Sequence, residues 1–521
     1  METALRRGSR GKNSNIGLQF LTHLMGRILS AQGCSPTSLD LKGFKALLKV
    51  VDTTCADSFD LFYGLFKYNA NAMDTMAKLK LAFSDIETDL RGQLKIQSAE
   101  IANAQPLALP APSKEESLRI SSMVKRISES QTAAVQALSK RLKDSGRRVN
   151  SALCIGEPDY QPPDVVLDAI GKAGDEGHTH YTVVQGDSEL RKGICDYLRD
   201  KKGAAYDPAQ VCVSNGGKQA IYQAFMAVCD PGDRVLVPTP CWVSYHDIAQ
   251  LCKAQPVSIT TTAEEGYLLT AAHLEQALQV DPGRCKVLVL CNPCNPTGAV
   301  LPRESLEAIA EVLRRPEFAH IYVLADEIYE QLVFDTPHVC FASLEGMQER
   351  TLLVGGFSKG FAMTGLRLGY LAARKAVAAA ATKLQGQITS CASSVSQRAG
   401  LAALRSDQAE WLRERLQELR EKRDYTVKRL REIPGVACPL PEGAFYAFAN
   451  LSGVLWERGL SGQDRLLRRA ARAPRRGAGA GRGLPRADVG APLVRVLDGG
   501  QDLQSAMDAF ADCVAELRPA P

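Results

Sequence analysis

The stretch Gly355-Gly-Phe-Ser-Lys-Gly-Phe-Ala-Met-Thr-Gly-Leu-Arg-Leu-Gly369 places a lysine in a loop of small residues. The loop follows the apolar run 351–354, which predicts a buried strand, so the amine of Lys359 can be exposed where that strand ends. A desolvated lysine near other cations has a lowered pKa and can form a Schiff base with a carbonyl compound. Arg367 can offer a planar guanidinium group to a phosphate. Taken alone, the stretch also fits an ordinary surface lysine.

Two further segments place polar residues directly after a buried run. The run 321–324 precedes Ala325-Asp-Glu-Ile-Tyr329, in which the carboxylate of Asp326 either pairs with a protonated ring nitrogen or only begins a helix. The run 286–290 precedes Asn292-Pro-Cys-Asn-Pro-Thr-Gly298, a rigid proline turn that is either part of a site or only a turn.

A fourth segment predicts a phosphate site at the beginning of a helix. Ser214-Asn-Gly-Gly-Lys-Gln219 follows the run 210–213 and opens a helical pattern, where free backbone N–H groups and the helix dipole favour an anion. The segment lacks the spacing of a P-loop, so this signal is weak by itself.

The alternation of helical stretches with short apolar runs predicts an α/β fold. The runs at 210–214, 234–237, 286–290 and 321–324 are apolar at nearly every position, which is typical of strands buried on both faces of a mostly parallel sheet. Ligands of such sheets bind at the carboxyl ends of the strands. A charged helix around residues 410–431 leads to a smaller C-terminal lobe.

Composition excludes several classes of function. The 521 residues are 45% apolar, which suits two compact domains with extra material rather than a disordered chain. A net charge of +5 argues against nucleic acid as the main partner, and the chain has no apolar run of eighteen residues that would span a membrane. The 15 cysteines are scattered, which favours a reducing compartment, and their spacing predicts no metal site.

The chain divides by composition into five parts. Residues 1–105 form an extension of unknown role whose Arg-rich start resembles an organelle transit peptide, and proline-rich residues 106–119 form a linker. Residues 120–160 are expected to begin a small domain and close over the site, 161–405 to form a large domain, and 406–521 to complete the small one.

In this order, the motifs resemble those of the fold-type I aminotransferases, which depend on pyridoxal 5'-phosphate. The likeness spans residues 120–450 and is greatest to bacterial-type aspartate aminotransferases and plastid aspartate (glutamate)–prephenate aminotransferases. Besides the segments above, the shared strings are Gly156-Glu-Pro-Asp-Tyr160, Tyr181-Thr-Val-Val-Gln-Gly186, Trp242-Val-Ser-Tyr245 and Glu442-Gly-Ala-Phe-Tyr446. The resemblance implies a large domain with a mostly parallel central sheet and helices on both faces, plus a smaller α/β domain from the N- and C-terminal segments.

The resemblance also implies roles for the cofactor-binding residues. Lys359 corresponds to the lysine that forms the Schiff base and moves the proton, and Asp326 to the acid that keeps the ring nitrogen protonated. The remaining expected cofactor contacts are Tyr329 and Asn295 to the phenolate oxygen, Trp242 to the ring face, Gly216, Gly217 and Arg367 to the phosphate, and Tyr181 to the phosphate of a second subunit. This last role implies a homodimer.

Substrate contacts follow from the same resemblance. Lys218 corresponds to a lysine that faces the distal carboxylate of aspartate, glutamate or prephenate, although it also fits a lysine beside the phosphate. Ser130 and Thr132 correspond to small hydroxyl residues of the closing segment, while Gly156, Trp242 and Asn295 complete the expected substrate contacts. Branch members that use prephenate are plastid enzymes, so we expect a plastid or cytoplasmic protein.

The C-terminal part departs from the family pattern. Residues 465–495 hold nine Arg, seven Ala and five Gly but no Lys or Glu, where the family has a helix and then an arginine that binds the substrate's α-carboxylate. Suitable codons for residues 477–485, read one nucleotide later, permit the family-like string Val-Leu-Val-Pro-Gly-Glu-Ala-Phe. We therefore hypothesise a frameshift in this block. Arg495 is either the carboxylate-binding arginine or a stray residue of the block.

Three functions remain open at this point. The first is an aminotransferase that moves the amino group of L-aspartate or L-glutamate to a 2-oxo acid, or to prephenate, in two half-reactions. The second is a cofactor-binding homologue without turnover, because the C-terminal region is disrupted. The third is another enzyme of the same fold, such as a C–S lyase or an aromatic aminotransferase, against which Lys218 argues.

Overall fold

The computed structural model describes residues 156–451 continuously, together with separate residues between 120 and 144, residues 453–454 and separate residues between 503 and 511. The chain divides after Leu118 into two units, and all of these residues belong to the second. The predictions for the N-terminal extension, the linker and the anomalous block lie outside the described residues. The five-part division stays a prediction.

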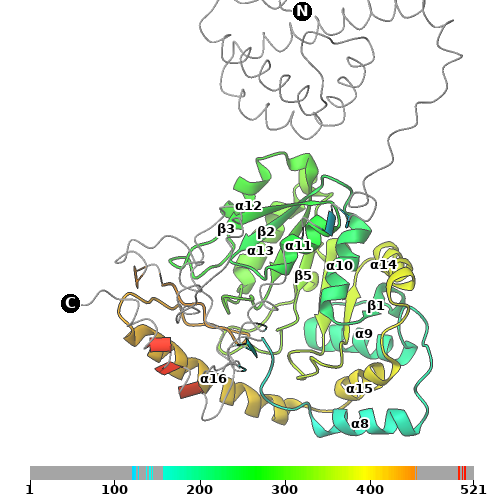
Figure 1. Ribbon diagram of the computed structural model, residues 1–521. Coiled ribbons are helices and arrows are strands. Elements are labelled where there is room, and N and C mark those ends of the chain that lie inside the picture. The colour runs from blue at the N-terminus through cyan, green and yellow to red at the C-terminus, as the bar shows by residue number, and fades with distance from the viewer. Residues whose placement is uncertain are drawn as a thin grey trace, which may run out of the picture. The chain divides into compact units, whose positions relative to one another are not determined.

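A seven-stranded sheet forms the centre of the described chain (Figure 1). Its strands are β1 (Val211–Ser214), β2 (Arg234–Thr239), β3 (Gln255–Thr260), β4 (Cys285–Cys291), β5 (Tyr322–Asp326), β6 (Thr351–Gly356) and β7 (Gly369–Ala372). The order across the sheet is β1-β7-β6-β5-β4-β2-β3, and only the pairings of β7 are antiparallel. The predicted α/β fold with a mostly parallel sheet is confirmed.

Helices cover both faces of this sheet (Figure 1). The helices are α8 (Asp164–Asp175), α9 (Ser188–Lys202), α10 (Gly217–Val228), α11 (Ser244–Leu251), α12 (Ala271–Leu278), α13 (Arg303–Arg314), α14 (Lys375–Ile388), α15 (Ser394–Arg405) and α16 (Ala409–Glu432). Short 3-10 turns are η3 (Pro208–Gln210), η4 (Pro282–Arg284), η5 (Pro316–Phe318), η6 (Phe341–Ser343) and η7 (Gln348–Arg350).

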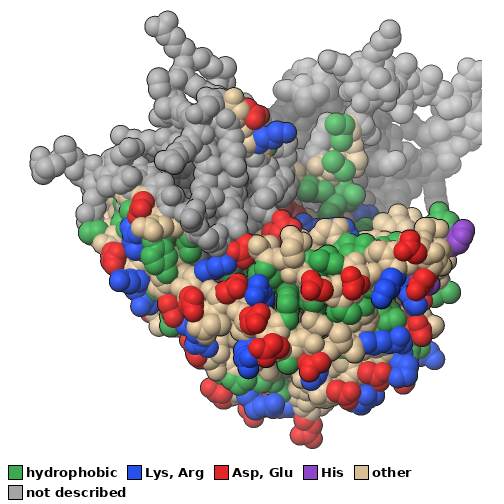
Figure 2. Space-filling model, turned by 90° about the horizontal axis from the view of Figure 1, so that it is seen from below, with side chains coloured by type: hydrophobic (Ala, Val, Ile, Leu, Met, Phe, Trp, Pro, Cys, Tyr) green, Lys and Arg blue, Asp and Glu red, His purple; other side chains and the backbone are tan. Residues whose placement is uncertain are grey.

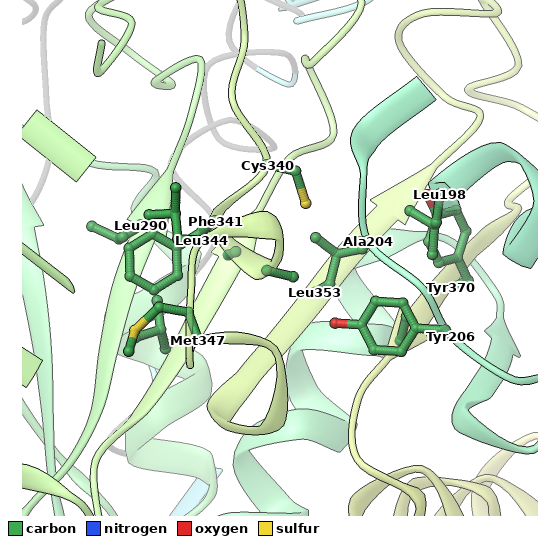
Figure 3. Close-up of a cluster of buried hydrophobic side chains, with 14 of the residues drawn as sticks. Leu198, Ala204, Tyr206, Leu290, Cys340, Phe341, Leu344, Met347, Leu353 and Tyr370 are labelled. Atoms are coloured by element: carbon green, nitrogen blue, oxygen red, sulfur yellow. The ribbon is translucent and has the colours of Figure 1, made fainter. Parts of the chain in front are cut away.

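Alternate side chains of the central strands serve two separate cores. In β4, Leu288 and Leu290 pack with residues of α9, α12, α13 and α15, while Val287 and Val289 pack with α10, α11 and α14. Period-two alternation between two buried faces explains why the strand is apolar at every position from Val287 to Leu290. Figure 3 shows part of the first core, where Phe341, Leu344 and Met347 lie beside Leu290.

The direction of the strands brings five loops to one edge of the sheet. Strands β2, β4, β5 and β6 are parallel, and β1 runs the same way because β1 and β6 are both antiparallel to β7. The lysine loop, the Asp326 segment, the proline turn, the predicted phosphate segment and the Trp242 string each follow one of these strands. Their polar residues therefore meet at the carboxyl ends, where α/β sheets bind ligands.

A third core lies beyond the sheet. Helix α16 confirms the charged helix expected at 410–431, and it contributes Val427 and Leu430 to a cluster that also contains Ala447, Leu451 and Met507. On the face drawn in Figure 2, the described basic and acidic side chains are interspersed. No helix within the described residues is long and apolar enough to cross a membrane.

Truncation of a central core side chain tests this packing. Leu288 is fully buried in β4, so Leu288→Ala should lower the free energy of unfolding by about 2–5 kcal/mol through lost burial and a cavity. Urea unfolding monitored by circular dichroism measures the change. Val280→Ala is the matched control, because that side chain is 61% exposed and its loss should change stability by less than about 0.5 kcal/mol. Equal effects of the two substitutions would contradict the assignment of the core.

Candidate active site

Polar residues after five aligned strands converge at the carboxyl edge of the sheet. Gly216 to Lys218 follow β1, Trp242 follows β2, Asn295 follows β4, Asp326 ends β5 and Lys359 follows β6. The loops are short, so the strands fix where these residues lie. The structure thus brings together residues that are 143 positions apart along the chain, from 216 to 359.

Asp326 is a buried carboxylate at the end of β5. Its Oδ2 accepts a hydrogen bond from the hydroxyl of Tyr245 at 2.6 Å, and its Oδ1 accepts one from the backbone N–H of Ile328 at 3.3 Å. Burial raises the pKa of Asp326 to about 6, against the effect of the Tyr245 hydrogen bond. Among the described residues, no basic side chain forms an ion pair with this carboxylate. The site can therefore take up a cationic group of a ligand.

Asn295 and two tyrosines form a second buried group. The amide Nδ2 of Asn295 donates to the hydroxyl of Tyr329 at 3.3 Å, and the hydroxyls of Tyr329 and Tyr446 are 2.6 Å apart. Burial and the neighbouring Tyr446 raise the pKa of Tyr329 well above its ordinary value, so its phenol stays protonated. Asn295 fills one of the acceptor positions of that hydroxyl, and the contact with Tyr446 holds its oxygen in place beside the site.

Lys359 lies beside the segment that begins at Gly156. Its Nζ donates to the backbone carbonyl of Gly156 and lies 5.7 Å from the ring centre of Phe445. A Cβ atom at Gly156 would lie 2.6 Å from the hydroxyl oxygen of Tyr446, so only glycine permits this approach. The lysine amine, the glycine carbonyl and the tyrosine pair therefore belong to one site.

The beginning of α10 forms a cradle for an anion. Gly216 has a left-handed φ of 82°, Gly217 begins the helix, and no side chain caps its free N–H groups. A Cβ atom on Gly216 would lie 2.6 Å from Nη2 of Arg367, so the guanidinium group lies directly against this glycine. Helix N–H groups together with an arginine favour a phosphate.

Lys218 and Trp242 form the wall beside this cradle. The Nζ of Lys218 lies 4.7 Å from the ring centre of Trp242, and that ring meets Tyr245 edge to face at 5.4 Å. Burial, followed by the nearby positive charge of Arg367, lowers the pKa of Lys218. A lysine in this position gains from a second anionic group on the ligand.

Four predicted residues are not placed in this group. Tyr181 is 88% exposed, in the segment between α8 and α9. Ser130, Thr132 and Arg495 lie outside the described residues.

The structure adds two site residues that had no assigned role. Tyr245 stands three positions after Trp242, which is one helical turn, and this spacing could have indicated a shared face. Tyr446 reaches Tyr329 from 117 positions away in the sequence, a pairing that no local pattern indicates.

The cysteines near the site serve as buried neutral side chains. Cys291 and Cys294 donate to the backbone carbonyls of Pro293 and Pro240, and burial raises the pKa of both thiols. Within the described part of the chain, no group of His, Cys, Asp or Glu side chains is arranged to hold a metal ion.

Comparisons with known proteins identify the relatives of this chain. The profile of the family "Aminotransferase class I and II" matches residues 151–482, and the profile "TYRAAT1-like, C-terminal domain" matches residues 28–101. The bifunctional aspartate aminotransferase and glutamate/aspartate-prephenate aminotransferase of Petunia hybrida is 45% identical over 341 residues, which are 65% of this chain and 70% of that protein.

Solved structures of aspartate aminotransferases are also similar to this chain. Aspartate aminotransferase from Rhizobium meliloti has a TM-score of 0.68 at 34% identity, and the match covers 76% of this chain and 99% of that one. Aspartate aminotransferase from Thermus thermophilus with maleate has a TM-score of 0.67 at 31% identity, with the same coverage of both chains.

The buried carboxylate yields a pH-dependent test of stability. Because the folded pKa of Asp326 lies above the ordinary value, the stability it contributes is complete below about pH 4 and is lost as the pH rises through about 6. Without ligand, Asp326→Asn should therefore be more stable than the natural chain by about 3 kcal/mol at pH 8. The difference should shrink as the pH falls towards 5.

Urea unfolding between pH 5 and 8 measures this effect. Asp168→Asn, at an exposed position of α8, is the control and should keep the pH dependence of the natural chain. An Asp326→Asn variant that is less stable throughout this range would refute the argument.

Proposed function

Because this chain belongs to the class I and II aminotransferases, which use pyridoxal 5'-phosphate, we propose that it takes the amino group from L-aspartate or L-glutamate. The acceptor is oxaloacetate, 2-oxoglutarate or prephenate, and the two half-reactions alternate on one site. The relatives described above, whose names are aspartate and aspartate/prephenate aminotransferases, favour neither a cofactor-binding protein without turnover nor a C–S lyase.

The residues of the site fit the cofactor. Gly216 and Arg367 form an anion cradle that a Cβ atom would fill, and Asp326 is a buried carboxylate without an ion pair among the described residues. A phosphate and a protonated ring nitrogen satisfy these two groups. When bound, the cofactor supplies an electron sink for the bond that breaks at the substrate Cα. The buried, unpaired Asp326 is the observation that carries the proposal.

Residues of the chain itself would orient the cofactor and move the protons. Asp326 holds the ring nitrogen protonated, while the neutral phenol of Tyr329, itself oriented by Asn295, donates to the phenolate oxygen. Trp242 provides a flat face for the ring. Lys359 would hold the cofactor through its amine, and the same amine, when free, would move the proton at the substrate Cα.

Lys218 supports the choice of an acidic substrate. Its amine lies 4.7 Å from the centre of the Trp242 ring, and burial together with the charge of Arg367 lowers its pKa, so a carboxylate of the substrate would stabilise its charge. Maleate, which occupies the Thermus thermophilus relative, is a dicarboxylate. Ser130, Thr132 and Arg495 remain proposed substrate contacts, with Arg495 at the α-carboxylate.

We assign Tyr181 to a homodimer. An 88% exposed tyrosine next to the 62% exposed Val183 leaves apolar surface in water. A second copy of the chain would cover it, and the phenol of Tyr181 would then contact the phosphate held by the other subunit.

Spectroscopy tests the proposed function. The chain purified with pyridoxal phosphate should show a visible band, and L-glutamate or L-aspartate should bleach it as the amino group is transferred. Lys359→Ala should lose the covalent link and transfer no amino group, because the substitution removes the amine that would form the link and move the proton. A band that forms and ignores both amino acids would refute the proposed substrates.

Lys218→Met tests substrate choice. The variant removes the charge that faces the distal carboxylate, so KM for L-aspartate should rise at least about tenfold, while the rate with L-phenylalanine should hardly change. Steady-state kinetics with both amino acids measure the effect. Lys383→Met, in the middle of α14 and away from the strand ends, is the control. Equal losses with both amino acids would assign Lys218 to the phosphate instead.

A further inference from the structure

A fully buried ion pair lies behind the strand ends and has no part in the proposed chemistry. Lys202 is the last residue of α9, and Glu327 directly follows Asp326. The lysine Nζ and the glutamate Oε2 are 3.0 Å apart, and both side chains are 2% exposed. A second carboxylate, that of Glu330, lies 3.7 Å from the same Nζ.

Apolar side chains of the core cover part of this pair. Leu198 and Ala204 flank Lys202 in the sequence and belong to the core of Figure 3, as does Phe341. Replacing a buried ion pair by apolar residues is often neutral for stability, whereas removing one partner leaves an uncompensated charge and is strongly destabilising. Stability alone therefore does not account for the pair, and its contacts indicate what it holds in place.

One set of contacts fixes the end of β5. Oε1 of Glu327 accepts a hydrogen bond from the backbone N–H of Phe341 at 3.0 Å. Its backbone N–H donates to the carbonyl of Val354 in β6 at 2.9 Å. Since Glu327 adjoins Asp326, these bonds set the position of the carboxylate that faces the cofactor ring.

A second set of contacts reaches the lysine loop. The hydroxyl of Tyr197 donates to Glu330 at 2.5 Å and accepts from Nε2 of Gln331 at 2.9 Å. A Cβ atom on Gly360 would lie 2.1 Å from Oε1 of Gln331, so this amide packs directly against the residue after Lys359. The charge of Lys202 thus lies between two carboxylates, each linked to one side of the active site.

We propose that Lys202 is a positioning residue: by balancing Glu327 and Glu330, it keeps the Asp326 segment and the Lys359 loop in register for the cofactor. The proposal rests on the proposed function. His338, whose Nε2 lies 3.6 Å from Oε2 of Glu327, has a pKa that burial lowers, so it replaces the lysine charge poorly. Without the lysine charge, Glu327 must take up a proton or move towards water, and either change disturbs the bond to Phe341. Neutralising Glu327 at the same time removes the cause of the disturbance.

A double-mutant cycle tests this role with Lys202→Met, Glu327→Gln and the combination of both. For each, we would measure the affinity of the cofactor-free chain for pyridoxal phosphate, the visible circular dichroism of the bound cofactor, and kcat and KM, well below the unfolding temperature. Lys202→Met should lower cofactor affinity and kcat by at least about tenfold, leave KM within about twofold, and weaken the dichroic band. The double variant should match Glu327→Gln within about threefold.

Lys192→Met is the matched control, because this lysine is on the same helix and forms an exposed pair with Asp196. It should leave all four quantities unchanged. A Lys202→Met variant that loses only thermal stability would overturn the proposal. If that variant does not fold, a double variant about tenfold worse than Glu327→Gln would also overturn it. Should the natural chain transfer no amino group from either amino acid, the proposed function fails, whereas cofactor affinity and dichroism still decide the role of Lys202.

Discussion

The burial of the Asp326 carboxylate is the constraint on which the site depends. Removing a charge from water is unfavourable unless a partner compensates, and burial raises the pKa of this group to about 6. The hydrogen bonds from Tyr245 and Ile328 compensate in part. A cationic ring nitrogen would compensate the rest of this free-energy cost. The cost of burying the charge in the chain alone therefore favours binding of the cofactor.

The fold determines where the buried carboxylate of Asp326 lies. Six of the seven strands run in one direction, and the carboxyl ends of five of them carry the site, so that Asp326, Lys359 and the beginning of α10 lie along a single edge. Glycines then bring the backbone close to functional groups, as Gly216 does beneath Arg367 and Gly156 beside Tyr446. The rigid sheet therefore determines the geometry of the site, and the short loops contribute the chemical groups.

The sequence predicted those parts of the sheet and the site that depend on neighbouring residues in the chain. Strands buried on both faces contain an unbroken apolar run, as β4 does from Val287 to Leu290. Strand β3 was missed because Gln255 and Ser258 are exposed at the edge of the sheet. Contacts between residues far apart in the sequence could not be predicted from such local patterns. Lys202 belongs to the run Arg199-Asp-Lys-Lys202, which is typical of a solvated helix end, and its partner Glu327 is 125 positions away.

Adjacent residues show how the same degree of burial serves two purposes. Burial works to raise the pKa of Glu327 too, yet the charges of Lys202 and His338 hold that pKa below its ordinary value. Asp326 forms no ion pair with a described residue, and the charge of Lys359 is the smallest influence on its pKa, so burial prevails and the pKa is raised. Both carboxylates are buried, so the difference comes from their partners rather than from their depth. The chain supplies its own cation to Glu327, which can therefore fix the backbone, and leaves Asp326 to be neutralised by what it binds.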